Sequence, residues 1–473
     1  MSEEERNRQE ESEIFFLVKR YEEMIANNES YYFDVDQFEN LIDYYFDRNN
    51  LKEAGKVLLY AHDLFPDSTA LLLREAQLLS AEGKLTRALN KLRKLLAFEP
   101  FNEDLHVTMA TIYSQLRDHK RAIEHYERVL QFGDSEMAND IYIDLAMEHE
   151  NNNDFNSAIA VLKEALEKNP ENETATYELA YCYERTDQSA EGIQYYQRFL
   201  DDHPYSFTAW YNLGNAFQKL ELYEKSIDAY DFSLAIDDSF SPANFNKANA
   251  LIKLDKYREA IECFEEVIAV EGESPTTFCM IGECHENMLQ YEWAEHFYKR
   301  ALEKDSSFPD AFIGLGVIRD LKGNTQQALP YFEQALKADP TNVDFMLITA
   351  TALKKCNRID AAENLYLEIL KIDKQCEDAW LDYSELLANE DRLESALEVL
   401  ENGIKEMSDQ SLVLKFRKVA YLHQNLHQKE AFELLEALLE KESEKIAELT
   451  SFYPEIEKEK SFGNLMNLYK KNK

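Results

Sequence analysis

Residues 207–240 read FTAWYNLGNAFQKLELYEKSIDAYDFSLAIDDSF and contain two helical patterns. In the first half, the spacing i, i+3, i+4, i+7 places four residues on one stripe of a helix: Trp210, Leu213, Gly214 and Phe217. After a turn, a second amphipathic pattern follows the same rule: Tyr223, Ser226, Tyr230 and Leu234. The stretch therefore predicts a hairpin of two antiparallel helices.

The hairpin has a close contact and an open flank. We expect Gly214 to face the small Ser226, because large side chains there would hold the two backbones apart. A single hairpin of about 34 residues leaves one apolar flank uncovered, so it requires neighbours of the same kind.

The same pattern recurs along most of the chain. Repeat starts fall at 35, 69, 103, 139, 173, 207, 241, 275, 309, 343, 377 and 411. Every spacing is 34 residues except that from 103 to 139, which carries two extra residues near 133–136. The period predicts a stack of hairpins.

Three positions within the repeat explain how hairpins would stack. Position 20 is usually alanine: Ala54, Ala88, Ala122, Ala158, Ala260, Ala294, Ala328, Ala362 and Ala396. Position 24 is usually large, as in Tyr196, Tyr230, Phe264, Tyr298 and Phe332. Position 32 is proline in five repeats, where it ends the second helix: Pro66, Pro100, Pro170, Pro204 and Pro340.

This pattern closely resembles the tetratricopeptide repeat family, whose signature is W-x2-L-G-x2-Y, then A-x3-F, then P. Good matches are Trp210, Leu213, Gly214 and Phe217, and also Phe312, Leu315 and Gly316 with Ala328, Phe332 and Pro340. The resemblance, about twelve repeats, implies an all-α, right-handed superhelical solenoid of antiparallel helix pairs. The last repeat departs from the pattern, with Arg417 and Lys418 at positions 7 and 8 and Ala431 one residue late.

The chain divides into three predicted segments. Residues 1–34 comprise an acidic stretch, expected to be disordered to about residue 10, and a capping helix. Residues 35–444 form the repeat solenoid with a degenerate last repeat, and no domain boundary is expected within them. Residues 445–473 are expected to form C-terminal capping helices.

Composition limits the classes of partner. The formal net charge is −40, from 91 Asp and Glu against 51 Lys and Arg. Such a field repels phosphate backbones and anionic lipid heads, so we expect neither nucleic acid nor a membrane as partner. A neutral or basic peptide fits the field better. The alternative explanation of the charge is solubility of a long surface.

The sequence offers no support for catalysis or for a cofactor. It contains no glycine-rich phosphate loop and no GxSxG, HExxH or CxxC motif. The pair Cys279 and Cys284 lies more than one helical turn apart, so we expect buried packing residues and no metal site. We predict a non-enzymatic protein without catalytic residues. The absence of an apolar signal segment and of CxxC pairs indicates a reducing, cytoplasmic location.

The first helix of each repeat offers an inner wall at positions 2, 5, 6, 9, 12 and 13, which point away from the second helix. In the central repeats these positions carry aromatic, asparagine and lysine residues. Asparagine amides can hold an extended peptide backbone, and aromatic rings add contact area. The predicted peptide-binding residues are Tyr177, Tyr181, Tyr211, Asn212, Asn215, Lys219, Phe245, Asn246, Asn249 and Lys253. The alternative is ordinary polar surface that packs between repeats.

Two family binding modes can be compared at these positions. An asparagine ladder like that in the superhelical arm of the O-linked N-acetylglucosamine transferase is matched by Asn212 and Asn246. Asn215 and Asn246 match two positions of the carboxylate clamp of chaperone-tail adaptors, but its three cations are replaced by Tyr211, Thr276 and Met280, which excludes the clamp. The resemblance implies a scaffold that binds a protein segment in its concave groove. The alternative is a structural subunit of an assembly or homo-oligomer, joined through its ends or convex face.

Overall fold

The structure, a computed structural model, describes residues 3–132, 137–442 and 445–471. These residues form helices joined by short connections, with no β-strand among them. The predicted all-α architecture of antiparallel helix pairs is confirmed. The two-residue insertion expected near 133–136 lies outside the described residues.

The chain divides into two compact units, Met1–Ala243 and Asn244–Lys473, here called unit 1 and unit 2. The boundary falls inside α14 (Ser241–Lys253). Nothing in the sequence indicates this boundary, because the repeats continue through it without a linker rich in glycine, proline or serine.

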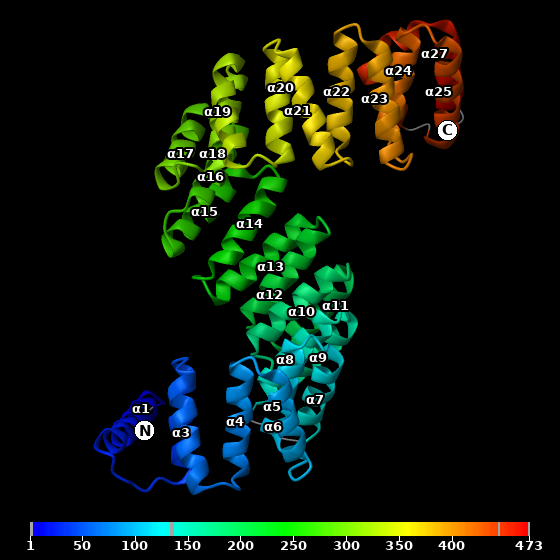
Figure 1. The fold of residues 1–473 in the computed structure, drawn as a ribbon. Coiled ribbons are helices and arrows are strands. Elements are labelled where there is room, and N and C mark those ends of the chain that lie inside the picture. The colour runs from blue at the N-terminus through cyan, green and yellow to red at the C-terminus, as the bar shows by residue number, and fades with distance from the viewer. Residues whose placement is uncertain (1–2, 133–136, 443–444, 472–473) are drawn as a thin grey trace. The chain divides into compact units, whose positions relative to one another are not determined.

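Unit 1 begins with α1 (Glu3–Asn27), which contacts α2 (Figure 1). The first helices of its repeats, here called A helices, are α2 (Val35–Asp47), α4 (Thr69–Ala81), α6 (Glu103–Gln115), α8 (Ala138–Asn151), α10 (Glu173–Arg185) and α12 (Phe207–Lys219). The second helices, called B helices, are α3 (Leu51–Leu64), α5 (Leu85–Leu96), α7 (His119–Gln131), α9 (Phe155–Lys168), α11 (Ser189–Asp202) and α13 (Tyr223–Ile236).

Unit 2 continues the alternation. After α14, its A helices are α16 (Pro275–Asn287), α18 (Pro309–Leu321), α20 (Val343–Lys355), α22 (Glu377–Asn389) and α24 (Leu412–Gln424). Its B helices are α15 (Tyr257–Glu271), α17 (Tyr291–Lys304), α19 (Thr325–Ala338), α21 (Ile359–Ile372), α23 (Leu393–Glu406) and α25 (Gln428–Glu442). The unit ends with α26 (Ile446–Phe452), the 3₁₀ helix η2 (Pro454–Lys458) and α27 (Lys460–Lys471).

Helix boundaries follow the sequence period. Every A helix begins at a predicted repeat start or one residue from it. Many A helices follow a capping side chain that accepts a hydrogen bond from the first turn: Asn102, Asn172, Ser206, Ser274, Asn342 and Ser411. The prolines at position 32 lie just beyond the ends of the B helices, as predicted.

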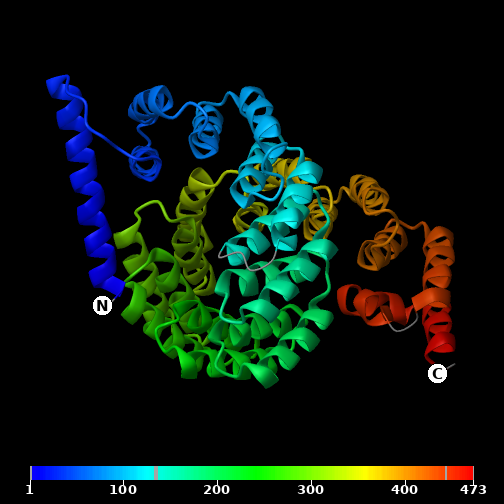
Figure 2. The same ribbon diagram turned by 90° about the horizontal axis from the view of Figure 1, so that it is seen from below.

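Within each unit the helices lie side by side in chain order (Figures 1 and 2). Each A helix other than α14 packs against the B helix that follows it, and several A helices of successive repeats also contact one another, as in α2 with α4, α10 with α12, α16 with α18 and α22 with α24. The A helices therefore form a continuous wall within a unit.

The closest approach in a hairpin involves positions 8 and 24. A Cβ atom on Gly214 would lie 2.5 Å from the Tyr230 ring, and one on Gly316 would lie 2.3 Å from the Phe332 ring. Gly214 therefore faces Tyr230, one helical turn beyond the expected Ser226. The absent side chain at position 8 leaves room for an aromatic ring, which buries more apolar area than serine.

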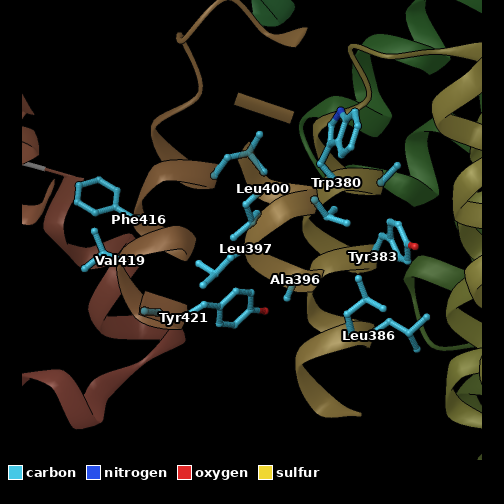
Figure 3. Packing of buried hydrophobic residues seen from close by; sticks show 14 of the residues in the cluster. Trp380, Tyr383, Leu386, Ala396, Leu397, Leu400, Phe416, Val419 and Tyr421 are labelled. Atoms are coloured by element: carbon cyan, nitrogen blue, oxygen red, sulfur yellow. The ribbon is translucent and has the colours of Figure 1, made fainter. Parts of the chain in front are cut away.

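Alanine at position 20 allows the core between helices to close. Figure 3 shows this packing in unit 2, where Ala396 and Leu400 of α23 lie among aromatic residues of α22 and α24, including Tyr383 and Tyr421. All four side chains are buried. Each hairpin thus covers the apolar flank of its neighbours.

The turn between A and B helices uses a residue with left-handed φ, mostly at position 15. Among the described residues, glycine fills this place at Gly83 and Gly323. Other side chains fill it at Asn49, Arg117, Asn153, Asp187, Glu221, Asp255, Leu289, Asn357, Asp391 and, one position later, Leu426. L-residues other than glycine adopt this conformation at a cost of about 1–2 kcal/mol.

Both ends differ in detail from the expectation. Helix α1 begins at Glu3, so residues 3–10, expected to be disordered, are helical; their glutamates favour a helix N-terminus. The last repeat looked degenerate in the sequence because it begins one residue later than the predicted start at 411: helix α24 starts at Leu412. Ser408 and Asp409 both have left-handed φ before α24, and the repeat pattern then resumes with the buried Ala431.

The C-terminal segment packs against the last repeat. Helix α27 contacts α25, and Phe462, Leu465 and Met466 are buried there. The Phe462 ring meets the rings of Phe432 and His423. These apolar side chains are therefore used inside unit 2.

Candidate functional site

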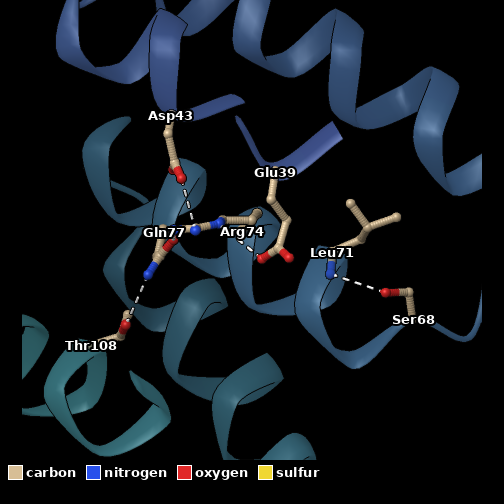
Figure 4. A network of polar contacts seen from close by, with 7 residues as sticks. All are labelled: Glu39, Asp43, Ser68, Leu71, Arg74, Gln77 and Thr108. Atoms are coloured by element: carbon tan, nitrogen blue, oxygen red, sulfur yellow. Dashed lines mark hydrogen bonds and ion pairs between the residues drawn. The ribbon is translucent and has the colours of Figure 1, made fainter. Parts of the chain in front are cut away.

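The inner wall is the face of the A helices that points away from the B helices. In the first repeats of unit 1 it is crossed by polar contacts (Figure 4). Arg74 of α4 donates to Asp43 of α2 at 2.9 Å and lies 3.4 Å from Glu39, while Gln77 donates to Thr108 of α6 at 3.2 Å. This part of the wall is occupied by its own side chains, which tie successive repeats together.

The predicted aromatic residues of unit 1 do meet. The rings of Tyr177 and Tyr211 lie 6.2 Å apart, edge to face, although they come from successive repeats. Tyr211 also contacts Phe240 at 5.1 Å. Tyr181 is 46% exposed beside Phe155. The structure thus places an aromatic surface where the sequence predicted one.

The predicted asparagines of unit 1 have structural partners. Asn212 is only 2% exposed, and its amide donates to the carbonyl oxygen of Thr176 in the preceding A helix at 3.1 Å. The Tyr230 hydroxyl donates to Asn215 at 2.8 Å. Asn212 consequently links two repeats. Lys219 is exposed and lies 3.6 Å from Glu184.

The other predicted residues lie on α14, in unit 2. The Phe245 ring contacts Phe264 at 5.5 Å, and Asn246 and Asn249 are half-buried. Lys253 is exposed, and its charge acts on Glu283 of α16.

Unit 2 contains a cavity of about 340 Å³ between α16 and α18, here called the first cavity. Its wall combines apolar and acidic groups: Thr276, Cys279, Met280, Glu283, Glu286, Tyr298, Phe308, Asp310, Ile313, Gly314 and Val317. Most of these are inner-wall positions of the two A helices. Met280 and Ile313 remain partly exposed.

A second cavity of about 380 Å³ continues along the same wall. It is lined by Val317, Asp320, Phe332, Leu347, Ile348, Thr351, Ala352, Asp378, Leu381, Asp382 and Arg417. Val317 lines both cavities, so they are neighbours in a depression of the wall that α16, α18, α20 and α22 form. We call this depression the inner groove.

The acidic groups of the groove are in different electrostatic states. Burial raises the pKa of Glu286, although the Tyr298 hydroxyl donates to it at 2.9 Å. Burial also raises the pKa of Glu283, against the opposing charge of Lys253. Asp320, by contrast, is neutralised by Lys355 at 2.6 Å. The ionised forms of Glu283 and Glu286 are therefore incompletely compensated.

Sequence reasoning missed the groove. Met280, Ile313 and Leu347 occupy positions 5 and 6, but apolar residues on an amphipathic helix are normally core. The sequence did contain one indication of the groove: positions 5 and 6 of a repeat point away from the B helix, so apolar residues at these positions lie on the inner wall. The shift that brings Arg417 to position 6 of the last repeat also required the structure.

A metal site and a membrane span are two further possibilities. No cluster of His, Cys, Asp and Glu in the described ranges has the arrangement of a metal site. Cys279 is buried, and burial raises the pKa of its thiol. No helix among the described residues is both long and apolar enough to cross a membrane.

Comparison with protein families gives matches to models described as tetratricopeptide repeat. They cover residues 103–132, 143–207, 207–240, 241–273, 279–343 and 321–377. Together these matches span more than half of the chain.

Similar solved structures include yeast Tom70, with 13% identity, TM-score 0.46 and coverage of 83% of this chain and 96% of that one. Another is the Cut9–Hcn1 hetero-tetramer of APC/C, with 15% identity, TM-score 0.41 and coverage of 82% and 90%. A sequence relative is the human general transcription factor 3C polypeptide 3, 28% identical over 136 residues. The match spans 28% of this chain and 15% of that protein.

Proposed function

The chain belongs to the tetratricopeptide repeat family, and from this membership we propose that it is a scaffold that binds a segment of another protein along the inner groove of unit 2. Tetratricopeptide repeats are typical of protein–protein interaction scaffolds, and their fold is generally non-enzymatic. The proposed partner is a protein or peptide of neutral or basic character, and neither nucleic acid nor a membrane is proposed.

The observation that carries this proposal is the pair of neighbouring cavities that share Val317. Val317, Leu347 and Leu381 are partly exposed in their walls, so apolar area is still available for burial. Each buried methylene contributes about 0.8 kcal/mol. Carboxylates at the rim add polar contacts that fix the orientation of a bound chain.

The inner groove can be tested by filling it. Val317→Tyr places a ring where the two cavities meet, and we expect it to abolish retention of native partners in affinity capture from the source cells. Leu367→Tyr, on the B helix α21, is the matched control because Leu367 is exposed away from the groove wall. Equal retention by wild type and Val317→Tyr would refute the groove.

The aromatic surface around Tyr177 and Tyr211 is a second proposed contact region. Asn212 is unsuitable for testing it, because removal of its bond to Thr176 would weaken repeat stacking. Tyr181→Ala and Lys219→Ala alter exposed groups only. Unchanged partner retention by this double variant would remove the region from the proposal.

A second function, that of an assembly subunit, is favoured by the exposure of Phe15 and Phe16 on α1, which are 66% and 68% exposed. A Phe15→Ser, Phe16→Ser variant should then lose assembly, as measured by light scattering. An unchanged molar mass would argue against this surface. Phe462 and its neighbours are buried, so the C-terminal tail offers less for such a contact.

A further inference from the structure

We propose that the first cavity receives a lysine or arginine side chain of the partner segment and that the second cavity receives a neighbouring apolar side chain. The inference rests on the proposed function and adds the chemistry of the occupant. It identifies the partner segment as an extended basic and apolar sequence.

The first cavity is matched to a cation with a long apolar stem. Its wall contains three carboxylates, Glu283, Glu286 and Asp310, and none of its lining residues carries a positive charge. Met280 and Ile313 offer apolar surface beside them. Lysine and arginine bury their methylene stems on such surface while the charged group reaches the carboxylates.

Two of these carboxylates have no direct partner, although the charge of Lys253 acts on Glu283. In the part of the chain that the structure describes, the side chains of Glu283 and Asp310 form no hydrogen bond or ion pair, and both are exposed to the cavity. Asp310 also acts on Glu283, since its negative charge helps to raise the pKa of that carboxyl group. A bound cation would remove this repulsion and would form charge-assisted hydrogen bonds.

The second cavity is more nearly neutral. It contains Asp378, but its other two carboxylates are compensated. Asp320 is paired with Lys355, and the charges of Lys354 and Arg417 oppose the rise in pKa that burial imposes on Asp382. Its apolar wall contains Leu347 and Leu381. This balance fits an apolar side chain better than a second cation.

A buried tyrosine hydroxyl lies behind the wall of the second cavity. Tyr366 is 0% exposed, and its hydroxyl faces the side chain of Thr351. Burial and then the charge of Asp382 raise the pKa of Tyr366, while the nearby Thr351 opposes this rise. Asp382 and Thr351 both line the cavity, so the hydroxyl lies near its wall. Tyr366 itself lines neither cavity, so its ring belongs to the core behind the wall.

The test uses the full chain and a positional-scanning library of acetylated dodecapeptides, with Lys, Arg, Glu, Leu or Ser fixed at each position. We expect selected peptides to carry Lys or Arg followed closely by Leu. Their affinity for Glu283→Gln, Asp310→Asn should fall about tenfold, and so should their affinity for wild type at high salt. The control Glu303→Gln, Glu333→Gln removes the same charge from exposed sites on α17 and α19 and should bind normally.

The outcomes separate the two proposals. Two outcomes would overturn the inference while the scaffold function stands. In the first, the selected peptides require Val317 but lack basic residues. In the second, they bind the Glu283→Gln, Asp310→Asn variant as tightly as the control variant. Selected peptides that bind Val317→Tyr as well as wild type, or a library that yields no binder, would overturn the groove itself and the inference with it.

Discussion

Single side chains decide how closely the helices of a hairpin approach. At Gly214 the neighbouring ring of Tyr230 occupies the space that a Cβ atom would need, whereas at Gly55 of α3 the nearest atom, on Leu78, would lie 3.5 Å away. These two glycines therefore have opposite roles although both are helical.

Gly214→Ala should lower the free energy of unfolding by about 1–3 kcal/mol, because the methyl group forces Tyr230 from its place. Gly55→Ala should be neutral or stabilising by up to about 1 kcal/mol, since alanine favours the helix and meets no clash. Urea unfolding followed by circular dichroism measures both. Equal effects of the two substitutions would contradict the assigned contact.

A pair of buried histidines predicts a pH dependence. His106 and His125 place their Nδ1 atoms 2.8 Å apart, so one ring donates and the other accepts, and the two rings cannot both be protonated at these atoms. Burial and then the neighbouring His106 lower the pKa of His125 to about 4. The unfolded chain, with an ordinary histidine pKa of about 6.5, binds protons at higher pH than the folded chain.

Stability should therefore fall as the pH drops from about 6.5 to about 4, by on the order of 2 kcal/mol after allowance for solvent screening. His125→Gln should remove this slope. The measurement is the difference in unfolding free energy between wild type and variant at each pH in that range. Because both proteins contain the same carboxylates, the effect of carboxylate titration cancels in this difference. A constant difference would show that the pair tolerates charge.

At the scale of helices, most of the fold follows from the sequence. The 34-residue period gives the helix starts because close packing of a hairpin favours a small residue at position 20, which is alanine in most repeats, as at Ala260. Three details did not follow. The reach of Tyr230 to Gly214 depends on ring orientation, the burial of Asn212 depends on a backbone carbonyl in another repeat, and the shift before α24 depends on the turn at Ser408.

The candidate site was less predictable from the sequence, because it also depends on contacts between side chains of different repeats. The period identifies which positions face the inner wall, and Tyr177 and Tyr211, at position 5 of successive repeats, have rings that meet. It does not show whether a wall is hollow. Around Arg74 the wall is crossed by ion pairs, and around Val317 it is open, because side chains from three helices together determine the free volume.

The terminal helix α27 should protect the last hairpin. Phe462 is 1% exposed, so Phe462→Ala should cost about 3–4 kcal/mol locally and speed amide hydrogen exchange in α24 and α25. Leu468→Ala is the control, because Leu468 is 58% exposed on the same helix. Exchange in α16 and α17 should not change. Slow exchange of α24 in the Phe462 variant would show that the cap is dispensable.

For the whole molecule, the excess of negative charge acts against the packing of the hairpins. The chain carries 91 acidic against 51 basic residues, so even complete pairing would leave 40 uncompensated negative charges. Self-repulsion among them opposes the compact state.

Added salt should accordingly stabilise the protein. Between about 10 mM and 150 mM NaCl the Debye length falls from about 30 Å to about 8 Å, and the urea midpoint should rise. Potassium chloride at equal ionic strength should act alike, which separates screening from ion-specific effects. A falling midpoint would mean that the surface ion pairs outweigh the repulsion.

The left-handed turn residues make the protein a favourable subject for thermostabilisation. Arg117, Glu221, Leu289 and Leu426 hold a conformation for which their side chains are poorly suited, while Gly83 and Gly323 show that glycine is accepted at equivalent places. Replacements at such separated sites generally combine additively. A handful of exchanges outside the inner groove could thus yield a heat-resistant form with unaltered recognition.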